Sequence, residues 1–374
     1  MLEHVVHLTS VHSRYDTRIF IKECRSLARK GYAVSLIVAD GSGDEVKDGV
    51  SIVDVGATQG RVDRIIKTTR RVYKKALELD GDFYHLHDPE LIPIGLKLKR
   101  LGKVVIFDAH EDVPKQLLSK PYLNKPAKWA LSKVYGAYET WACKRLDAIV
   151  TATPFIRDKF LTINANSIVI NNFPILGELT STSNDWSQRR NEVCYVGGIA
   201  AIRGISEVVQ AMGQVRSGAC LQLGGRFSEK GIESEVKGYP GWQNVEELGF
   251  VDREGVRNIL SRSVAGLVTF LPLPNHIEAQ PNKMFEYMSA GVPVIASNFP
   301  LWREIIEGNE CGLCVDPMSP GEIAEAIDFL VNNPVQAKQM GERGQRAVRE
   351  RYNWSIEEKK LVDLYASLAK YEYS

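Results

Sequence analysis

The chain has 374 residues, of which 44% are hydrophobic and 25% charged, and its formal net charge is +1 at pH 7. This length favours two domains, and the composition is ordinary for a soluble enzyme. No stretch approaches the roughly 20 apolar residues that a membrane-spanning helix needs, so the sequence predicts no membrane span.

Short apolar strands alternate with helices over the first half of the chain. Strand, helix and strand joined by short connections form a right-handed parallel unit. The predicted strands are 4–10, 33–40, 82–88, 104–110, 147–153 and 167–173, and the predicted helices include 18–32, 64–79, 90–101 and a long helical region that ends near residue 145. The sequence therefore predicts one doubly wound domain over residues 1–173.

The alternation stops at residues 174–190, which are rich in turn-forming residues, and we interpret them as a linker. It restarts with predicted strands at 192–198, 220–225, 264–270 and 293–297, and helices at 204–212, 253–262 and 319–332. Residues 191–355 are thus expected to form a second doubly wound domain. We expect the last segment, 356–374, to be a helix that packs back on the first domain.

Two parallel-sheet domains of this kind are predicted to face each other across a cleft, because ligands of open α/β sheets bind at the carboxyl ends of the strands. Neither first strand is followed by the GxGxxG pattern of dinucleotide-binding domains. The first turn, TSVHSRYDTR at 9–18, contains no glycine at all. Ordinary dinucleotide binding is therefore disfavoured.

The segment NHIEAQPNKMFEYMSAGVPVIAS (275–297) carries two carboxylates and one cation just before a predicted strand. We expect Glu278 to lie in a loop, and Lys283 and Glu286 to lie on a helix that begins at Pro281 and stops at Gly291. The free N–H groups at the start of that helix and the ammonium of Lys283 favour an anion such as a diphosphate. Carboxylates accept hydrogen bonds from sugar hydroxyls, so the segment predicts a site for a nucleotide sugar.

This segment resembles the retaining family-4 glycosyltransferases of the GT-B fold. YVGGIAAIRGISEVVQA (195–211) is similar to that family's glycine-rich loop and helix, and REIIEGNECGLCVDP (303–317) is similar to the loop after its donor site. HLHDPEL and FDAHEDVP in the first half resemble a subgroup common in bacterial surface-polysaccharide assembly. The order of these segments matches over nearly the whole chain.

The resemblance implies a role for each matching residue of the second domain. Glu286 would bind the ribose and Glu278 the transferred sugar, while Arg203 and Lys283 would neutralise the leaving diphosphate. Gly198 departs from the family, which usually has an arginine there. The remaining residues expected at the donor are Asn282 at the helix start and the backbone of Phe250 and Val251, which would contact the base.

In the first domain, His110 matches a family histidine that contacts the sugar, and Asp16 and Arg18 in the glycine-free turn are candidates for the acceptor. The resemblance also implies transfer without a metal or other cofactor, with the diphosphate itself taking the proton from the attacking hydroxyl. The reaction it predicts moves a sugar from a UDP- or GDP-linked donor to a glycan or a lipid-linked oligosaccharide in cell-surface polysaccharide assembly.

Two alternatives stay open: a nucleotide-sugar epimerase of similar fold, and a catalytically degenerate partner subunit. No nucleic-acid partner is expected.

The first 172 residues hold 27 lysines and arginines against 20 aspartates and glutamates, a net charge of +7, and the remainder carries −6. Residues 114–137 alone contain five lysines and no acidic residue, interleaved with Trp129 and other apolar residues. Such a stretch suits an anionic membrane surface through Lys120, Lys125, Lys128, Trp129 and Lys133, or it is a solvated helix whose apolar side is core. We expect a cytoplasmic protein, with the inner face of the cytoplasmic membrane as a second location if the first alternative holds.

Metal ligands are not evident from spacing. His85 and His87 alternate with Leu86 and share one face of a strand, but the sequence shows no third ligand beside them. Cys311 and Cys314 form a single CxxC without a second pair. The sequence therefore predicts no metal site.

Overall fold

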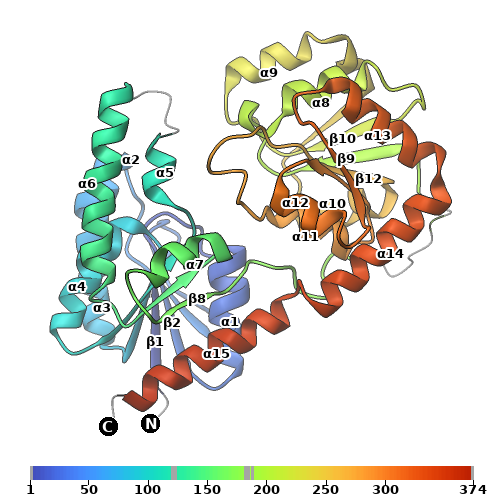
Figure 1. The fold of residues 1–374 in the computed structure, drawn as a ribbon. Coiled ribbons are helices and arrows are strands. Elements are labelled where there is room, and N and C mark those ends of the chain that lie inside the picture. The colour runs from blue at the N-terminus through green and yellow to red at the C-terminus, as the bar shows by residue number, and fades with distance from the viewer. Residues whose placement is uncertain (1–2, 119–123, 181–185, 187–188, 372–374) are drawn as a thin grey trace. The chain divides into compact units, whose positions relative to one another are not determined.

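A computed structural model describes residues 3–118, 124–180, 186 and 189–371. The chain divides into two compact units, one of residues 1–172 and 356–374, the other of residues 173–355 (Figure 1). Each unit contains one sheet with helices packed on it, and both sheets are almost wholly parallel, as the alternating pattern predicts.

The first unit is built on an eight-stranded sheet of order β3-β4-β2-β1-β5-β6-β7-β8, in which only the β3–β4 pair is antiparallel. Its strands are β1 (His4–Leu8), β2 (Ala33–Val38), β3 (Glu45–Lys47), β4 (Val50–Asp54), β5 (Phe83–Leu86), β6 (Val104–Ala109), β7 (Ala148–Thr151) and β8 (Ser167–Val169). The strands β1, β5 and β6 are almost wholly buried because helices cover both faces of a parallel sheet. They are mainly apolar but carry the buried polar residues His7, His85 and Asp108.

The helices of this unit follow the strands in the expected order. They are η1 (Thr17–Cys24), α1 (Arg25–Arg29), α2 (Gly60–Asp63), η2 (Arg64–Thr68), α3 (Thr69–Leu79), η3 (Pro89–Leu91), α4 (Ile92–Arg100), α5 (Val113–Leu118), α6 (Lys125–Cys143), α7 (Pro154–Leu161) and α15 (Trp354–Tyr371). The helix predicted at 18–32 begins as a π-helix, η1, which Asp16 caps by accepting hydrogen bonds from the backbone N–H groups of Arg18 and Ile19. The hairpin of β3 and β4 was not predicted.

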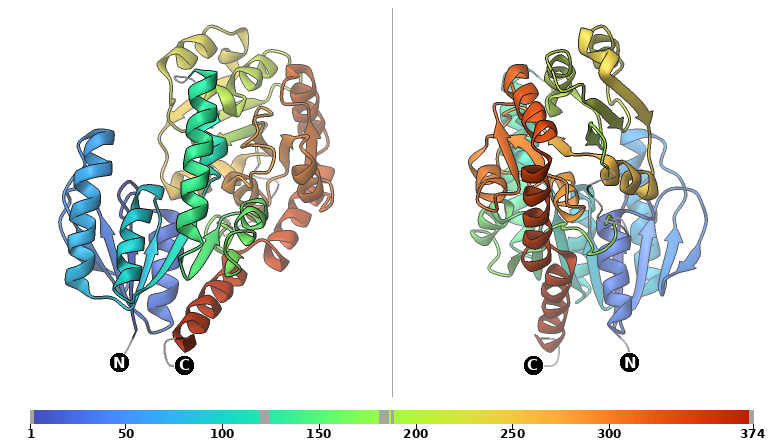
Figure 2. Two further views of the ribbon diagram at one scale, coloured as in Figure 1. Left: turned by 60° about the vertical axis from the view of Figure 1, so that its left-hand side comes forward. Right: turned by 90° about the vertical axis from the view of Figure 1, so that its right-hand side faces the viewer.

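Helix α15 is last in the chain but belongs to the first unit. Tyr365 of this helix packs against Tyr32 and Phe83, and the Glu357 carboxylate accepts a hydrogen bond from the backbone N–H of Asn171. The start of β1 and the last turns of α15 lie at the same end of this unit in every view (Figures 1 and 2). Docking of this helix completes the face of the sheet next to α1.

The second unit has a six-stranded parallel sheet of order β11-β10-β9-β12-β13-β14. Its strands are β9 (Glu192–Val196), β10 (Cys220–Gly224), β11 (Val245–Gly249), β12 (Ala265–Val268), β13 (Val294–Ser297) and β14 (Gly312–Val315). Numbered from its own first strand, this is the order 3-2-1-4-5-6 of doubly wound nucleotide-binding folds, whose strand order reverses between β9 and β12. Ligands of such sheets bind beyond the carboxyl ends of the strands at that reversal.

The helices of the second unit are η5 (Ala201–Arg203), α8 (Ile205–Met212), α9 (Lys230–Lys237), η6 (Pro240–Asn244), α10 (Arg253–Arg262), α11 (Asn282–Ser289), α12 (Pro300–Ile306), α13 (Pro320–Asn332) and α14 (Pro334–Glu350). Helix α11 begins one residue later than predicted, because Pro281 has an extended ψ of 129° and is the N-cap. The helix ends just before Gly291, whose φ of +69° reverses the chain.

The segment 174–190, expected as a linker, belongs to the second unit. Glu178 pairs with Arg253, and the Arg189 guanidinium donates to the backbone carbonyls of Leu260 and Ser263. These contacts fix both ends of the segment to the unit that follows it.

Candidate functional site

Lys283 occupies the point where the strand order of the second sheet reverses. It lies on the first turn of α11, and its Nζ is 3.5 Å from the ring centroid of Tyr195 in β9 and 5.4 Å from that of Phe270, which follows β12. The side chain is buried, and Nζ has no hydrogen-bond partner among the residues that the structure describes. Burial and the neighbouring Arg203 hold the pKa of Lys283 well below its ordinary value. A buried amine without a partner is costly unless a ligand supplies one.

Arg203 approaches the same aromatic ring from the glycine-rich loop between β9 and α8. Its guanidinium carbon lies 5.5 Å from the Phe270 ring centroid, and Nη1 donates to the Gly198 carbonyl over 3.1 Å. Gly204 sets this loop close to the sheet: its φ is +76°, and a Cβ there would lie 2.0 Å from the Thr269 carbonyl oxygen. In the described part of the chain, neither Arg203 nor Lys283 forms an ion pair with a carboxylate.

Gly198 leaves room for that guanidinium. A Cβ at this position would lie 2.8 Å from Nη1 of Arg203, so a side chain here would require the guanidinium of Arg203 to shift. The structure thus gives a reason for the departure from the family pattern: Arg203 takes the space beside residue 198 that an arginine at 198 would need.

Glu286 lies one turn beyond Lys283 on α11 and is held by an arginine that sequence reasoning missed. Its Oε1 accepts from Nη1 of Arg253 over 2.8 Å, while Nε of Arg253 donates to Glu178 over 2.8 Å. Arg253 is the first residue of α10, 33 positions away from Glu286 in the chain. Because no local spacing links the two residues, the pair could not be predicted from sequence patterns.

The other residues expected at the donor lie around these. Glu278 is half-buried in the irregular segment before α11, and its carboxylate has no partner among the described residues. Asn282 is the first residue of α11. Phe250 and Val251 follow β11; Phe250 is 68% exposed with the Arg226 guanidinium 4.8 Å from its ring centroid, whereas Val251 is half-buried. The exposed ring of Phe250 is free to stack with a planar group.

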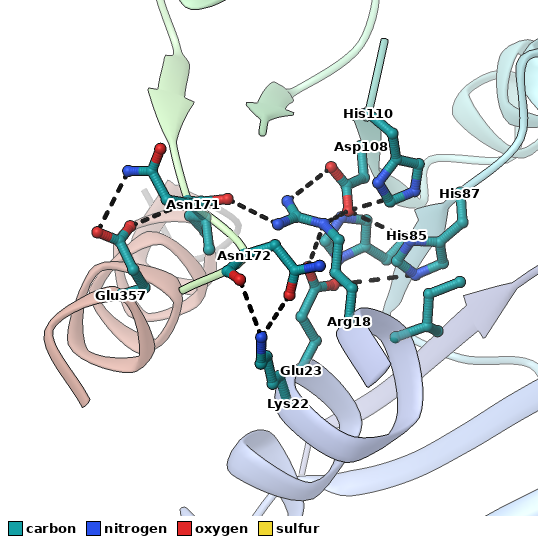
Figure 3. Close-up of polar contacts among 12 residues, drawn as sticks. Arg18, Lys22, Glu23, His85, His87, Asp108, His110, Asn171, Asn172 and Glu357 are labelled. Carbon is teal, nitrogen blue, oxygen red and sulfur yellow. Dashed lines mark hydrogen bonds and ion pairs between the residues drawn. The ribbon is translucent and has the colours of Figure 1, made fainter. Parts of the chain in front are cut away.

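The acceptor candidate Arg18 is buried in the first unit. It donates from Nε and Nη2 to both oxygens of Asp108 over 2.8 and 2.9 Å, and from Nη1 to the Ile170 carbonyl over 2.7 Å (Figure 3). Burial alone would raise the pKa of Asp108, but the charge and hydrogen bonds of Arg18 together with the neighbouring His110 and His87 hold that pKa well below its ordinary value. With its donors engaged in this way, Arg18 ties η1 to β6 and β8.

His110 and Asp16 lie near this ion pair and are more accessible. His110 follows β6, with Nε2 3.7 Å from Asp108 Oδ2, and burial lowers its pKa to about 4, so the imidazole is neutral at pH 7. Asp16 lies 3.5 Å from Nδ1 of His12, whose Nε2 is 3.3 Å from Asp88.

His12 was not predicted as a functional residue. Burial lowers its pKa, but the hydrogen bonds to Asp16 and Asp88 outweigh burial and raise it to about 10, so His12 is an imidazolium at neutral pH. The same pairing holds the pKa of Asp16 at about 2 against the effect of burial. The glycine-free first turn therefore presents a cation, the 32%-exposed imidazolium of His12, and a carboxylate. The sequence did not reveal this cation because one of its two carboxylate partners, Asp88, is distant in the chain.

The chain has two doubly wound units, and in the second the side chains of Lys283 and Arg203 lie at the reversal of the strand order, without a carboxylate partner among the described residues. This is the arrangement of a nucleotide-binding α/β protein. Models of two protein families match this chain: "Glycosyl transferases group 1" over residues 178–347 and "Glycosyltransferase Family 4" over residues 17–173. The chain belongs to the family 4, group 1 glycosyltransferases and has the GT-B fold.

Individual relatives agree with this assignment. The chain is 23% identical over 308 residues to a phosphatidyl-myo-inositol mannosyltransferase of Mycobacterium leprae, which covers 78% of this chain and 75% of the relative. The fold of this chain is similar to that of sucrose-phosphate synthase from Thermosynechococcus elongatus, with a TM-score of 0.80 and 18% identity; the match covers 99% of this chain and 100% of the synthase chain. It is also similar to Anabaena Alr3699/HepE in complex with UDP-glucose, with a TM-score of 0.74, 12% identity and coverage of 97% and 99%.

Proposed function

We propose that the protein is a retaining glycosyltransferase that moves a sugar from a UDP- or GDP-linked donor to a glycan or lipid-linked acceptor in cell-surface polysaccharide assembly. The observation that carries the proposal is the pair of cations, Lys283 and Arg203, which share the Phe270 ring and lack a carboxylate partner among the described residues. Holding two basic side chains this close together without an anion costs free energy, and a bound diphosphate would supply the missing negative charge.

The chemistry follows from where negative charge develops. As the bond between the sugar and the diphosphate breaks, charge grows on the diphosphate oxygens, and Arg203, Lys283 and the first N–H groups of α11 would stabilise it. His110, neutral at pH 7, and Glu278 would contact hydroxyls of the transferred sugar. The acceptor hydroxyl would attack on the face that the diphosphate leaves, and the diphosphate would take its proton. With this charge supplied by the protein, we propose that transfer needs no metal ion at the diphosphate.

Two relatives support the donor and acceptor classes. The Anabaena structure contains UDP-glucose, and the mycobacterial relative is named for mannosyl transfer to a phosphatidylinositol. Glu286 would hold the ribose with the carboxylate oxygen that Arg253 leaves free, and the exposed ring of Phe250 would lie near the base. These assignments rest on the placement of the side chains around α11.

Glu286→Ala is expected to weaken binding of the free nucleoside diphosphate by roughly ten- to a hundredfold, because a hydrogen bond to a charged group is worth about 1.5–3 kcal/mol. Since the ribose contact exists in both ground and transition states, kcat should change less than affinity. Calorimetric titration with UDP and GDP measures this. Glu178→Gln is the control, since it disturbs Arg253 equally without removing the ribose ligand, and should bind nearly normally. Unchanged affinity in Glu286→Ala would place Glu286 outside the donor site.

We also propose that helix α6 meets an anionic membrane surface, which would bring the enzyme to a lipid-linked acceptor. Trp129 is 63% exposed and Val134 70% exposed on this helix, beside Lys125, Lys128 and Lys133, so its apolar residues are not all core. Lys120, expected in the same patch, lies outside the described residues. Among the described residues, no helix is both long and apolar enough to cross a membrane.

Reversing Lys125, Lys128 and Lys133 to glutamate should release the protein from vesicles that contain anionic lipid, because each lysine near such a surface is worth about 1 kcal/mol. High salt should have the same effect on the wild type through screening. Co-sedimentation with anionic and neutral vesicles measures both. Reversal of Lys230, Lys237 and Lys338, which lie in the second unit, is the control. If the wild type binds anionic and neutral vesicles equally, the lysines of α6 form only a solvated face.

A further inference from the structure

Four buried side chains of the first unit converge on one point. They are His7 of β1, Glu23 of η1, and His85 and His87 on and just after β5, and each offers one ligand atom within 4.8 Å of the other three. All are at most 1% exposed. His85 and His87 were visible in the sequence as a pair without a third ligand, and the fold brings the missing ligands from two other elements (Figure 3 labels three of the four).

The distances surround a single position. Oε2 of Glu23 lies 4.0 Å from Nδ1 of His7, 3.9 Å from Nδ1 of His85 and 4.0 Å from Nε2 of His87. A tetrahedral ion with bonds of about 2.0–2.1 Å would place its ligand atoms roughly 3.3–3.4 Å apart. The carboxylate oxygen would therefore move by less than about 1 Å to share an ion with the three imidazoles.

The buried carboxylate of Glu23 lacks a hydrogen-bond partner among the described residues. Among the described residues, Oε2 of Glu23 accepts no hydrogen bond although it is surrounded by imidazole nitrogens. Buried carboxylates are normally hydrogen-bonded, paired or bound to a metal. The charged neighbour Arg18 lies 3.2 Å from the other oxygen, Oε1, and is itself committed to Asp108. An ion at the centre would give Oε2 its partner.

A second carboxylate orients one of the imidazoles from behind. Nδ1 of His87 faces Oδ2 of Asp108 at 3.4 Å, and Asp108 is fixed by the two hydrogen bonds from Arg18. A proton on Nδ1 leaves the lone pair of Nε2 directed at Glu23 and His7. Nδ1 makes no hydrogen bond among the described residues, but histidines that bind metals typically donate their other N–H to a carboxylate placed as Asp108 is.

We propose that His7, Glu23, His85 and His87 bind one divalent transition-metal ion, with zinc as the best fit to three imidazoles and one carboxylate. Because four protein ligands close the coordination sphere and the site is buried, the ion is structural and ties β1, β5 and η1 together. It is separate from Lys283, Arg203 and Glu286, the residues proposed to hold the diphosphate and the ribose, which lie in the other unit. Binding of the ion would break the 2.8 Å hydrogen bond between Nδ1 of His7 and Nε2 of His87, because both nitrogens would coordinate the ion instead.

The hydroxyl of Tyr365 on α15 distinguishes this proposal from a purely hydrogen-bonded cluster. It lies 2.9 Å from Nδ1 of His85, the nitrogen that would bind the ion. If an ion is bound, Tyr365→Phe removes a competitor, so occupancy should be kept or should rise. If the cluster is held only by hydrogen bonds, Tyr365→Phe removes one of them and lowers the unfolding temperature equally with zinc and with chelator.

The test begins with protein purified without an affinity tag that contains histidine and without chelator. Elemental analysis should find about one zinc per chain, and zinc added to metal-stripped protein should raise the unfolding temperature by about 5 °C or more. Cobalt added instead should give the intense visible absorption of a tetrahedral site. Glu23→Gln and His85→Gln should lose the bound ion. His4→Gln is the matched control, because His4 lies on the same strand but bonds Ser35 outside the cluster, and it should keep the ion.

Several results would overturn the proposal. One is a wild type with less than about a tenth of an ion per chain and no change in unfolding temperature on addition of zinc. Another is full occupancy that survives in both Glu23→Gln and His85→Gln. If these two variants fail to fold, Tyr365→Phe decides: an equal loss of stability with zinc and with chelator would rule out the ion. Binding of nucleoside diphosphates is independent of all these outcomes.

Discussion

Replacing Lys283 by methionine is expected to lower kcat by roughly a hundredfold or more while making the protein more stable. The loss of activity follows because charge on the diphosphate grows in the transition state, and removing one donor to such charge typically costs about 3 kcal/mol. The gain in stability follows because Nζ is buried against Tyr195 and Phe270 without a partner. An apolar side chain of similar length should raise the free energy of unfolding by about 1 kcal/mol or more.

Steady-state turnover and urea unfolding of the same preparation measure both effects. Lys338→Met, at an exposed lysine of α14, should change neither by much. Arg203→Ala should lower kcat by a similar factor with less effect on stability, since in the described part of the chain its guanidinium donates one hydrogen bond, to a loop carbonyl. Near-normal turnover in both Lys283→Met and Arg203→Ala would contradict their assignment to the leaving group. A less stable Lys283→Met protein would show that Lys283 has a structural partner.

Asp108→Asn is expected to cost about 3–5 kcal/mol of stability, because it removes the charged carboxylate that accepts two hydrogen bonds from the buried guanidinium of Arg18. The double variant Arg18→Met, Asp108→Asn should recover much of this loss, since it removes both members of the pair together. Urea unfolding of the two single variants and the double variant gives the coupling free energy directly.

A surface pair provides the comparison for that cycle. Arg14 and Asp40 make the same two-pronged contact, with distances of 2.8 and 2.7 Å, but near the surface. Asp40→Asn should therefore cost at most about 1 kcal/mol. If Asp108→Asn costs no more than Asp40→Asn, or if the effects of Arg18→Met and Asp108→Asn simply add, the buried pair does not hold η1 on the sheet.

The layout of the fold could be predicted because it depends on local patterns. Alternating strands and helices with short connections specify two parallel sheets, and both are present. Lys283 and Glu286 could be placed on one helix because Pro281 and Gly291 mark its ends. The β3–β4 hairpin was missed because its first strand, Glu45–Lys47, is short and largely exposed and carries no apolar run.

The parts of the site that were not predicted depend on contacts between distant residues. The pairing of Arg253 with Glu286 joins α10 to α11, and the pairing of His12 with Asp88 joins the first turn to the end of β5. An arginine in the sequence can be exposed or buried, and nothing near Arg18 in the chain indicates which. The sequence therefore could not show that Arg18 is buried and pairs with Asp108. The approach of His7 and Glu23 to His85 and His87 likewise depends on the order of strands in the sheet, which single-sequence patterns do not give.

The central claim is that Lys283 and Arg203 hold the diphosphate of a sugar nucleotide, and a thermal-shift screen with UDP-, GDP- and ADP-linked sugars tests it most directly. A true donor at about 100 times its dissociation constant should add about 2.7 kcal/mol to the stability of the wild type. We expect a clear upward shift of the unfolding temperature with at least one sugar nucleotide, and little or no shift with the same compound in Lys283→Met and Arg203→Ala. The absence of a shift with every sugar nucleotide, or an equal shift in the wild type and both variants, would contradict it.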